Sequence, residues 1–371
     1  MPIIAAIAAP LAFTFGFFNS VAPSGDGKKA NSSKAKVNKK QTESTTKTVR
    51  GSTIADPPPN LPNTWFTIVG DFLYWRADED GLTYALDDDN NKAKGLDPDF
   101  EWKPGYRAGV GFQFNRDDNW DMMFIWTGLN SHAEDSKTIN QDSFGEDRLS
   151  PRWVPSLLGT AATHASVDWK LKYNTIDWYM GRDFFVGKKL TFHPIAGIRG
   201  AWISQDYDVH YRSQFANSGF ASTSFDADTS FKGVGMRAGI DIKYHVNNNF
   251  GLCGNLAGAF FYGWTNVKEK IHGFQTNPAG IFAPVDFTYR HNFQGTRTNL
   301  DGGLGFLVEG DIRRSGPHIS LTVKYEFSEW FSQNVLTNLG FQNGSSTPTS
   351  SDQQDRNLGL QGLTIDLRLD F

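Results

Sequence analysis

The residues of this 371-residue chain that could do chemistry are charged side chains at every second position of otherwise apolar segments. Arg107, Arg237 and Asp301 each share one face of such a segment with glycines, while rings and aliphatic side chains take the other face. Rows of arginines and acids inside a barrel create an electric field that acts on small ions. The candidate lumen-facing residues are Asp71, Arg107, Asp177, Arg199, Arg237, Asp241, Asp301 and Glu309. Because both signs are present, these residues fit either a weakly selective water-filled path or a salt-bridged plug.

The eight histidines are the other residues that could carry catalysis or bind a metal. They stand at His132, His164, His193, His210, His245, His272, His291 and His318. Some fall near loop ends, where a rim site could lie. No two have the spacing of a metal site or a catalytic triad, and no nucleophile motif or phosphate loop accompanies them. We therefore expect scattered solvent-exposed histidines, and a protein that is not an enzyme, uses no metal or cofactor and binds no nucleic acid.

The elements that must hold the charged residues are strands, as the end of the chain illustrates. From Leu363 to Phe371, apolar and polar residues alternate strictly, which places them on opposite faces of a strand. A soluble β-sandwich could use this pattern, but a last strand that closes on an aromatic C-terminal residue is typical of barrels inserted by the outer-membrane assembly machinery. We therefore predict that Leu367, Leu369 and Phe371 form an assembly signal.

The composition favours the same class. Aromatic residues make up 14% of the chain, yet its mean hydropathy is only −0.44. A transmembrane barrel needs one apolar face per strand and aromatic girdles at the two interfaces, and it keeps its other face polar. After the first 20 positions there is no apolar run of the roughly 18 residues that a membrane helix needs.

Residues 64–371 contain ten strand-like segments whose connections alternate between short and long. The segments are approximately 64–78, 99–115, 120–133, 166–185, 190–211, 226–245, 250–269, 286–312, 317–336 and 355–371. Short turns at 116–119, 186–189, 246–249 and 313–316 alternate with long connections at 79–98, 134–165, 212–225, 270–285 and 337–354. Tight periplasmic turns and long outside loops are the layout of an outer-membrane barrel. The sequence predicts an all-β, antiparallel up-and-down transmembrane barrel of ten strands, or twelve if the longest segments are split.

The N-terminal region is expected to lie outside this barrel. Residues 1–22 resemble a signal peptide that ends in a small-x-small cleavage site, although no basic residue precedes the apolar run, and a short uncleaved anchor is the alternative. Residues 23–63 hold eight basic and three acidic residues with almost no large apolar side chain. This composition predicts a disordered basic and proline-rich periplasmic linker.

Several stretches resemble the Legionella-type major outer membrane protein family, whose members also occur in chlamydia-related bacteria. They are DFLYWRADEDGLTYA at 71–85, PGYRAGVGF at 104–112, DDNWD at 117–121 followed by WT at 126–127, DWYMGRDF at 177–184 and HPIAGIR at 193–199. The resemblance implies a pore-forming protein of the Gram-negative outer membrane. The chain departs from the cysteine-rich chlamydial major porins, because a single cysteine, Cys253, permits no internal disulfide.

These observations predict a porin-like barrel that lets small ions or solutes diffuse through a narrow charged lumen. Its expected partners are outer-membrane lipid, lipopolysaccharide and the assembly machinery, and association of several copies is left open. The alternative is a surface-exposed structural or adhesin-like barrel that acts through its outer loops. The connection 134–165 contains Trp153, Val154, Leu157 and Leu158, which either fold back into the barrel mouth or bind a partner, and folding back is favoured because exposed Trp is costly.

Overall fold

The computed structural model describes residues 65–89, 92–115, 120–139, 147–154, 162–215, 219–276, 282–312, 317–341, 348–353 and 355–371. The predicted signal peptide (1–22) and linker (23–63) lie outside these residues. Within them no helix is long and apolar enough to cross a membrane.

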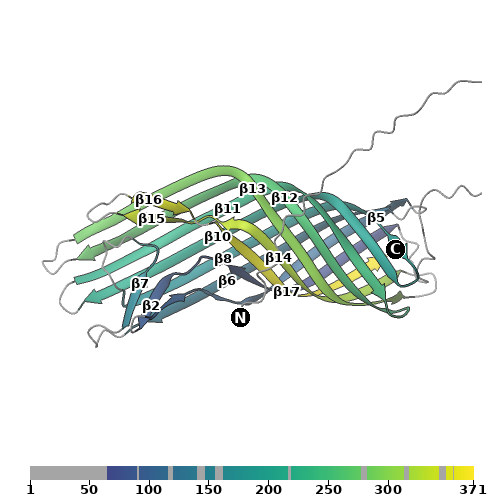
Figure 1. The fold of residues 1–371 in the computed structure, drawn as a ribbon, viewed down its shortest axis with the longest axis horizontal. Helices are drawn as coiled ribbons and strands as arrows, with labels where there is room; N and C mark the ends of the chain where they lie inside the picture. Colours follow the sequence, from purple (N-terminus) through teal and green to yellow (C-terminus); the bar gives the residue numbers. More distant parts are fainter. Residues whose placement is uncertain are drawn as a thin grey trace, which may run out of the picture. The chain divides into compact units, whose positions relative to one another are not determined.

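Ten antiparallel strands form a closed barrel, as the sequence predicts (Figure 1). They are β1 (Phe66–Glu79), β5 (Trp102–Asn115), β6 (Trp120–Thr138), β8 (His164–Arg182), β10 (Leu190–Phe215), β11 (Gly219–His245), β12 (Phe250–Thr276), β13 (Phe282–Asp311), β14 (His318–Asn334) and β17 (Arg356–Asp370). Neighbours in the chain pair with one another, and β1 pairs with β17 to close the ring. The backbone polar groups along the barrel wall are therefore satisfied within the sheet.

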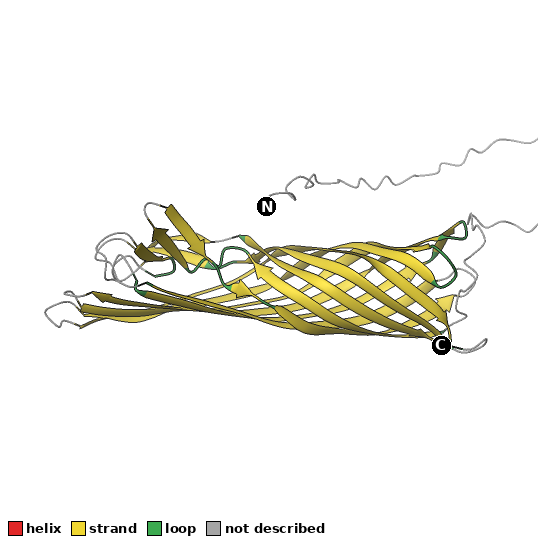
Figure 2. Ribbon diagram, turned by 90° about the horizontal axis from the view of Figure 1, so that it is seen from below, coloured by secondary structure: helices red, strands yellow, loops and turns green. Residues whose placement is uncertain are grey.

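Seven short strands complete the described part of the fold. β2 (Ala85–Asp89), β3 (Lys92–Leu96) and β7 (Asp147–Pro151) make a three-stranded sheet, and β15 (Thr337–Phe341) and β16 (Pro348–Gln353) make a hairpin. β4 (Asp99–Phe100) pairs with β6, and β9 (Phe184–Val186) pairs with β10. The labelled strands of the small sheet and the hairpin lie toward one end of the barrel, and the C-terminus lies at the other (Figures 1 and 2).

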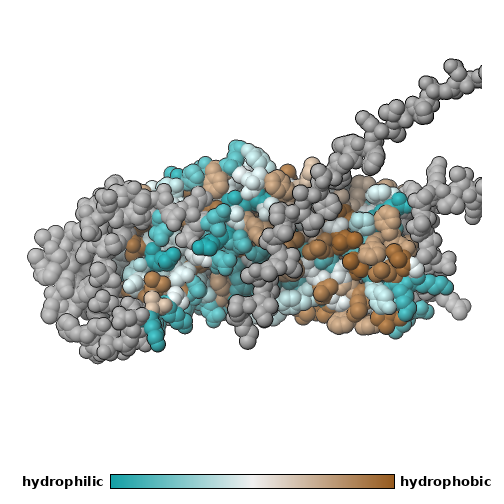
Figure 3. Space-filling view, viewed as in Figure 1, coloured by the Kyte–Doolittle hydropathy of each residue, from teal (hydrophilic) through white to brown (hydrophobic). Residues whose placement is uncertain are grey.

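The two faces of each strand have the predicted characters. On β1, Val69, Asp71 and Leu73 are buried inside the barrel, whereas Phe72 and Tyr74 between and beyond them are exposed on the outside. The same alternation holds on the other barrel strands, and the exposed apolar side chains gather toward the end that carries the C-terminus (Figure 3). This outward apolar surface is the lipid-facing belt of the barrel.

Strands β10 to β13 are each three to seven residues longer than the sequence predicted. They contain 26, 27, 27 and 30 residues, whereas a membrane-spanning strand needs about 9–11. Most of the predicted connections 212–225 and 270–285 is therefore strand, and only 216–218 and 277–281 lie outside the described residues. The prediction was wrong because the outer side of the extension faces water, so its residues are polar like those of a loop. The inner side still shows the strand period of two, with Phe225 and Ile271 buried.

The connection after β6 folds back into the barrel mouth, as favoured from the sequence. Trp153 comes shortly after β7, and its ring is buried. The ring stacks on Phe225 at 5.0 Å between centroids and meets Tyr207 edge-on at 5.7 Å. Its indole N–H donates to the backbone oxygen of Thr83 at 2.9 Å. Val154 packs partly buried against the same core, whereas Leu157 and Leu158 lie outside the described residues.

The terminal strand is fixed from both sides by β1 and β14. Leu367 and Phe371 are exposed on the outer face, and the Phe371 backbone N–H donates to the oxygen of Phe66 at 2.8 Å. This placement leaves the side chains free to be recognised during insertion. The role of Leu367, Leu369 and Phe371 as an assembly signal stays a prediction.

The layout predicts opposite reactivities for cysteines at the two ends of the barrel. In a Cys253→Ala background, Lys94→Cys on exposed β3 should react with a membrane-impermeant maleimide on intact cells. The reason is that the three-stranded sheet lies at the end of the barrel that we expect to face outside the cell. Lys188→Cys, in the exposed turn between β9 and β10, should react only after the outer membrane is opened. Labelling of Lys188→Cys on intact cells would invert the orientation.

Candidate functional site: the barrel lumen

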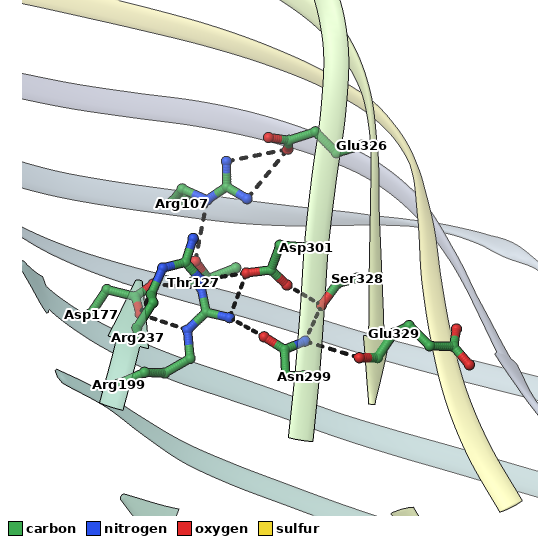
Figure 4. A network of polar contacts seen from close by, with 10 residues as sticks. All are labelled: Arg107, Thr127, Asp177, Arg199, Arg237, Asn299, Asp301, Glu326, Ser328 and Glu329. Carbon is green, nitrogen blue, oxygen red and sulfur yellow. Dashed lines mark hydrogen bonds and ion pairs between the residues drawn. The ribbon is translucent and has the colours of Figure 1, made fainter. Parts of the chain in front are cut away.

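A network of charge-assisted hydrogen bonds joins several strands inside the lumen (Figure 4). Arg199 binds Asp177 through two parallel contacts, Nε to Oδ1 at 2.6 Å and Nη2 to Oδ2 at 2.8 Å. Its Nη1 reaches Asp301 Oδ2 on β13, past β11 and β12, at 2.7 Å. Arg237 pairs with the same Asp301 carboxylate, and the Ser328 hydroxyl donates to Asp301 Oδ1 at 2.7 Å. The Asp301 side chain on β13 thus links β10, β11 and β14.

A second network lies on the neighbouring wall. The Arg107 Nη1 atom is 2.7 Å from Asp71 Oδ2 and 3.3 Å from Glu326 Oε2. Lys324 Nζ lies 3.0 Å from Glu326 Oε1, so two cations share this carboxylate. Arg107 also donates from Nε to the Thr127 hydroxyl at 3.3 Å.

Strand register explains why these particular residues meet. Asp71 is the direct cross-strand partner of Arg107, and Arg199 is that of Asp177, so each pair sits side by side on the inner face. Gly235 is the partner of Arg199 on the other side. A Cβ at Gly235 would collide with the backbone of Phe260 on β12, so glycine permits the close strand approach there.

A cavity of about 210 Å³ lies among these residues. Its charged lining consists of six basic residues, Arg107, Arg199, Arg237, Lys243, Lys324 and Arg368, and six acidic ones, Asp71, Asp177, Asp241, Asp301, Glu326 and Asp366. Seven of the eight predicted lumen residues line this cavity. The eighth, Glu309, also faces inward but lies nearer the turn end of the barrel, where its Oε1 is 2.7 Å from His245 Nε2.

Sequence reasoning missed a ring of histidines at the turn end of the lumen. His193 is 3.0 Å from Asp121 and 3.5 Å from Asp241, His245 pairs with Glu309, and His318 Nδ1 is 2.9 Å from Asp311. These three histidines are hydrogen-bond partners of carboxylates rather than scattered solvent residues. Strand parity could have found them, because each shares the inner face with lumen charges, as His193 does with Arg199 on β10.

A layer of aromatic rings fills the lumen on the outer side of the cavity. The Trp330 side chain is fully buried, with its ring 4.9 Å from Phe261, 5.9 Å from Tyr173 and 6.5 Å from Phe231. We call Trp330, Phe261, Tyr173 and Phe231 the aromatic layer. Tyr173 also lines the cavity, so the layer borders it directly.

Glu79 is an ionisable group buried beyond the lipid-facing belt. It ends β1, where Arg76 and Asp78 on the outward face mark the change from lipid to water. Burial removes water from the carboxyl group and raises its pKa from 4.5 to about 8, although Gln205 and Trp169 act in the opposite direction. The group is therefore neutral in the folded protein at neutral pH.

In the described part of the chain, no three histidine, cysteine or acidic side chains are grouped so that they could hold a metal ion. The arrangement of closed antiparallel strands, a lipid-facing belt and a charged interior defines an outer-membrane β-barrel. The chain matches, over residues 58–371, the family described as Legionella pneumophila major outer membrane protein precursor, and it therefore belongs to that family. It is a protein of the bacterial outer membrane that crosses the bilayer with many strands, as predicted.

The search of curated proteins finds no match for the chain. Among solved structures, the outer membrane protease OmpT from Escherichia coli is similar, with a TM-score of 0.36 and 10% identity over 84% of this chain and 99% of that one. The toluene transporter TodX of P. putida has a TM-score of 0.28 and 7% identity, over 84% and 91% of the two chains. A FadL homologue of Pseudomonas aeruginosa has a TM-score of 0.25 and 8% identity, over 83% and 91%. These likenesses are weak and say nothing about function.

The raised pKa of Glu79 predicts how stability depends on pH. The unfolded chain releases this proton near pH 4.5 and the folded barrel only near pH 8, so between these values the group lowers the free energy of unfolding by about 1.4 kcal/mol per pH unit. Glu79→Gln should remove this part of the slope and make the barrel more stable than wild type at pH 8 and above. Urea unfolding in lipid vesicles at pH 5 and pH 8.5 measures it, and parallel pH dependences for both proteins would contradict the assignment.

Proposed function

We propose that the protein is a low-conductance pore for small ions and that the structure is its closed state. The observation that carries this proposal is the charged cavity of about 210 Å³ inside the membrane-spanning part of the barrel. A barrel that only needs a solid filling can use apolar side chains, as this one does on the outer side of the cavity. Twelve charged residues around a water-sized space are instead suited to ions.

The charge balance sets the expected selectivity. Six basic and six acidic side chains line the cavity, and many of them are paired at hydrogen-bond distance. At distances larger than the separation within one pair, the fields of its positive and negative charge largely cancel. An ion in the cavity would therefore meet local sites of either sign but no strong net potential, and the pore should discriminate weakly between cations and anions.

The aromatic layer is the element that must move for ions to pass. Its four rings pack together in the lumen between the cavity and the barrel mouth. Rings packed in this way hinder passage, because an ion cannot cross an apolar layer without losing its hydration at great cost. We infer that opening requires displacement of Trp330, the ring that contacts the other three.

A second candidate function is a surface role in which the lumen never opens. The observation that favours it is the extension of β10 to β13 beyond the lipid-facing belt, with its inner side packed around Trp153. Such a rigid projection can present a surface outside the cell without any conduction. The two functions differ in whether current flows.

Truncation of the aromatic layer separates the two functions. Trp330→Ala should cost about 3–5 kcal/mol of stability but leave an inserted barrel, and in planar bilayers it should raise the open probability or the conductance well above wild type. Trp330→Phe, which keeps a ring at the site, is the matched control and should behave like wild type. If wild type and Trp330→Ala both stay silent at every voltage, with insertion shown independently, the pore is excluded and the surface role stands.

The lumen charge is tested with Arg237→Gln. Asp301 keeps its contact with Arg199 in this variant, so its carboxylate stays paired while the cavity lining loses one positive charge. The reversal potential in a salt gradient should shift toward cation selectivity. Lys268→Gln removes a charge from the outer surface and should leave the reversal potential unchanged. Equal reversal potentials for Arg237→Gln and wild type in a conducting barrel would show that ions take another route.

A further inference from the structure

Three outward-facing residues form a row on the outer wall of the barrel. Lys232 on β11 is the direct cross-strand partner of Trp202 on β10 and of Trp264 on β12. All three side chains are exposed, with fractions of 43% for Trp202 and 54% for Trp264. Opposed Cβ atoms in a sheet are about 4.5–5.5 Å apart, so the lysine lies between the two tryptophans in the sheet.

The row marks the outer border of the lipid-facing belt. On β11 the next outward residues toward the turns are Val234 and Met236, 60% and 80% exposed, whose apolar side chains belong in lipid. In the other direction the outward residues are Ser230 and Asp228. This border lies on the side of the long strand extensions, away from the short turns and the C-terminus, and it therefore faces the outer leaflet.

The three polar groups of the row have no hydrogen-bond or ion-pair partner among the described residues. Other groups on the same wall do: Lys170 lies 3.0 Å from Asp168, Lys268 lies 3.5 Å from Asp228, and the Trp126 indole donates to Asn174 at 3.4 Å. The Lys232 ammonium and the indole N–H groups of Trp202 and Trp264 are left as donors. A row of donors that includes a cation fits an anion with several acceptor oxygens.

The two tryptophans are held in place by their neighbours. The Trp202 ring lies along the strand over Gly200, where an added Cβ would come within 3.0 Å of the ring. The Trp264 ring is 6.3 Å from Tyr262, whose hydroxyl donates to Gln294 at 2.7 Å. Because these positions are set before any lipid arrives, less freedom is lost on binding.

We propose that Trp202, Lys232 and Trp264 bind a phosphate group of lipopolysaccharide in the outer leaflet. The outer leaflet of this membrane consists of phosphorylated glycolipid, and its phosphates lie at the depth where the belt ends. Tryptophan prefers this interfacial depth, and a lysine near an anionic membrane surface adds favourable electrostatic energy. The acyl chains of the same lipid would lie along Val234 and Met236. The inference is independent of whether the lumen conducts.

The test compares two lipids and a set of variants. Full-length protein in a neutral detergent is titrated with phosphorylated lipid A and with chemically dephosphorylated lipid A, and bound lipid is counted by native mass spectrometry. Wild type should retain the phosphorylated lipid preferentially. Lys232→Gln should lower its affinity about fivefold, the loss expected for one lysine near an anionic surface, while Lys232→Arg should retain most of the affinity. Trp202→Phe and Trp264→Phe, which remove one indole N–H each, should weaken it less.

Lys270→Gln is the matched control, because Lys270 is also an exposed outward lysine but lies farther from the belt on β12. It should bind like wild type. Heat-modifiable migration on a gel verifies that each variant is a folded barrel. Equal retention of the two lipids by wild type, or equal losses for Lys232→Gln and Lys270→Gln, would overturn the proposal.

Discussion

The structure depends on one constraint, which is that a backbone in lipid must satisfy its own hydrogen bonds. The pairing of β1 with β17 closes the sheet, so no strand edge is left open within the belt. Closure gives every strand one face toward lipid and one toward the lumen. Rings and aliphatic side chains must take the first face, and any charge must take the second.

Charges turned inward then need partners, since an unpaired ion in a narrow lumen is costly. Asp301 accepts from two arginines and a serine, and Glu326 is shared by Arg107 and Lys324. Buried ion pairs stabilise a fold little when compared with apolar packing of the same volume. The outer half of the barrel interior is filled with aromatic rings, whereas the membrane-spanning half contains ion pairs. Stability alone does not explain these ion pairs, so we infer that the charges serve the function of the lumen.

The interior is divided into two parts of opposite character. Toward the turns it is polar, with paired charges, a small cavity and three histidines bound to carboxylates. Toward the mouth it is an apolar core, in which Trp330, Trp153 and Phe225 are buried. The outer wall has the reverse order, apolar at the level of lipid and polar on the extensions of β10 to β13. The pattern of the outer wall follows from contact with lipid at one level of the strands and with water at the other.

The sequence by itself determined the ten barrel strands, their inner and outer faces and the inward direction of the charged residues. A period of two is a local property, and the alternation of short and long connections reveals the up-and-down order. Even the inward direction of His193 follows from its parity with Arg199. The lengths of β10 to β13 were underestimated from the sequence, because the strand residues outside the bilayer have polar outward side chains, as loop residues do.

Only the tertiary structure decided which charges meet and which rings fill the lumen. Arg199 on β10 and Asp301 on β13 are separated by two strands, and their contact depends on the register of each strand between them. The burial of Trp153 in the mouth and the packing of Trp330 depend on side chains from several strands, which no local pattern can relate. Closure of the sheet brings these residues together, and closure is a property of the whole chain.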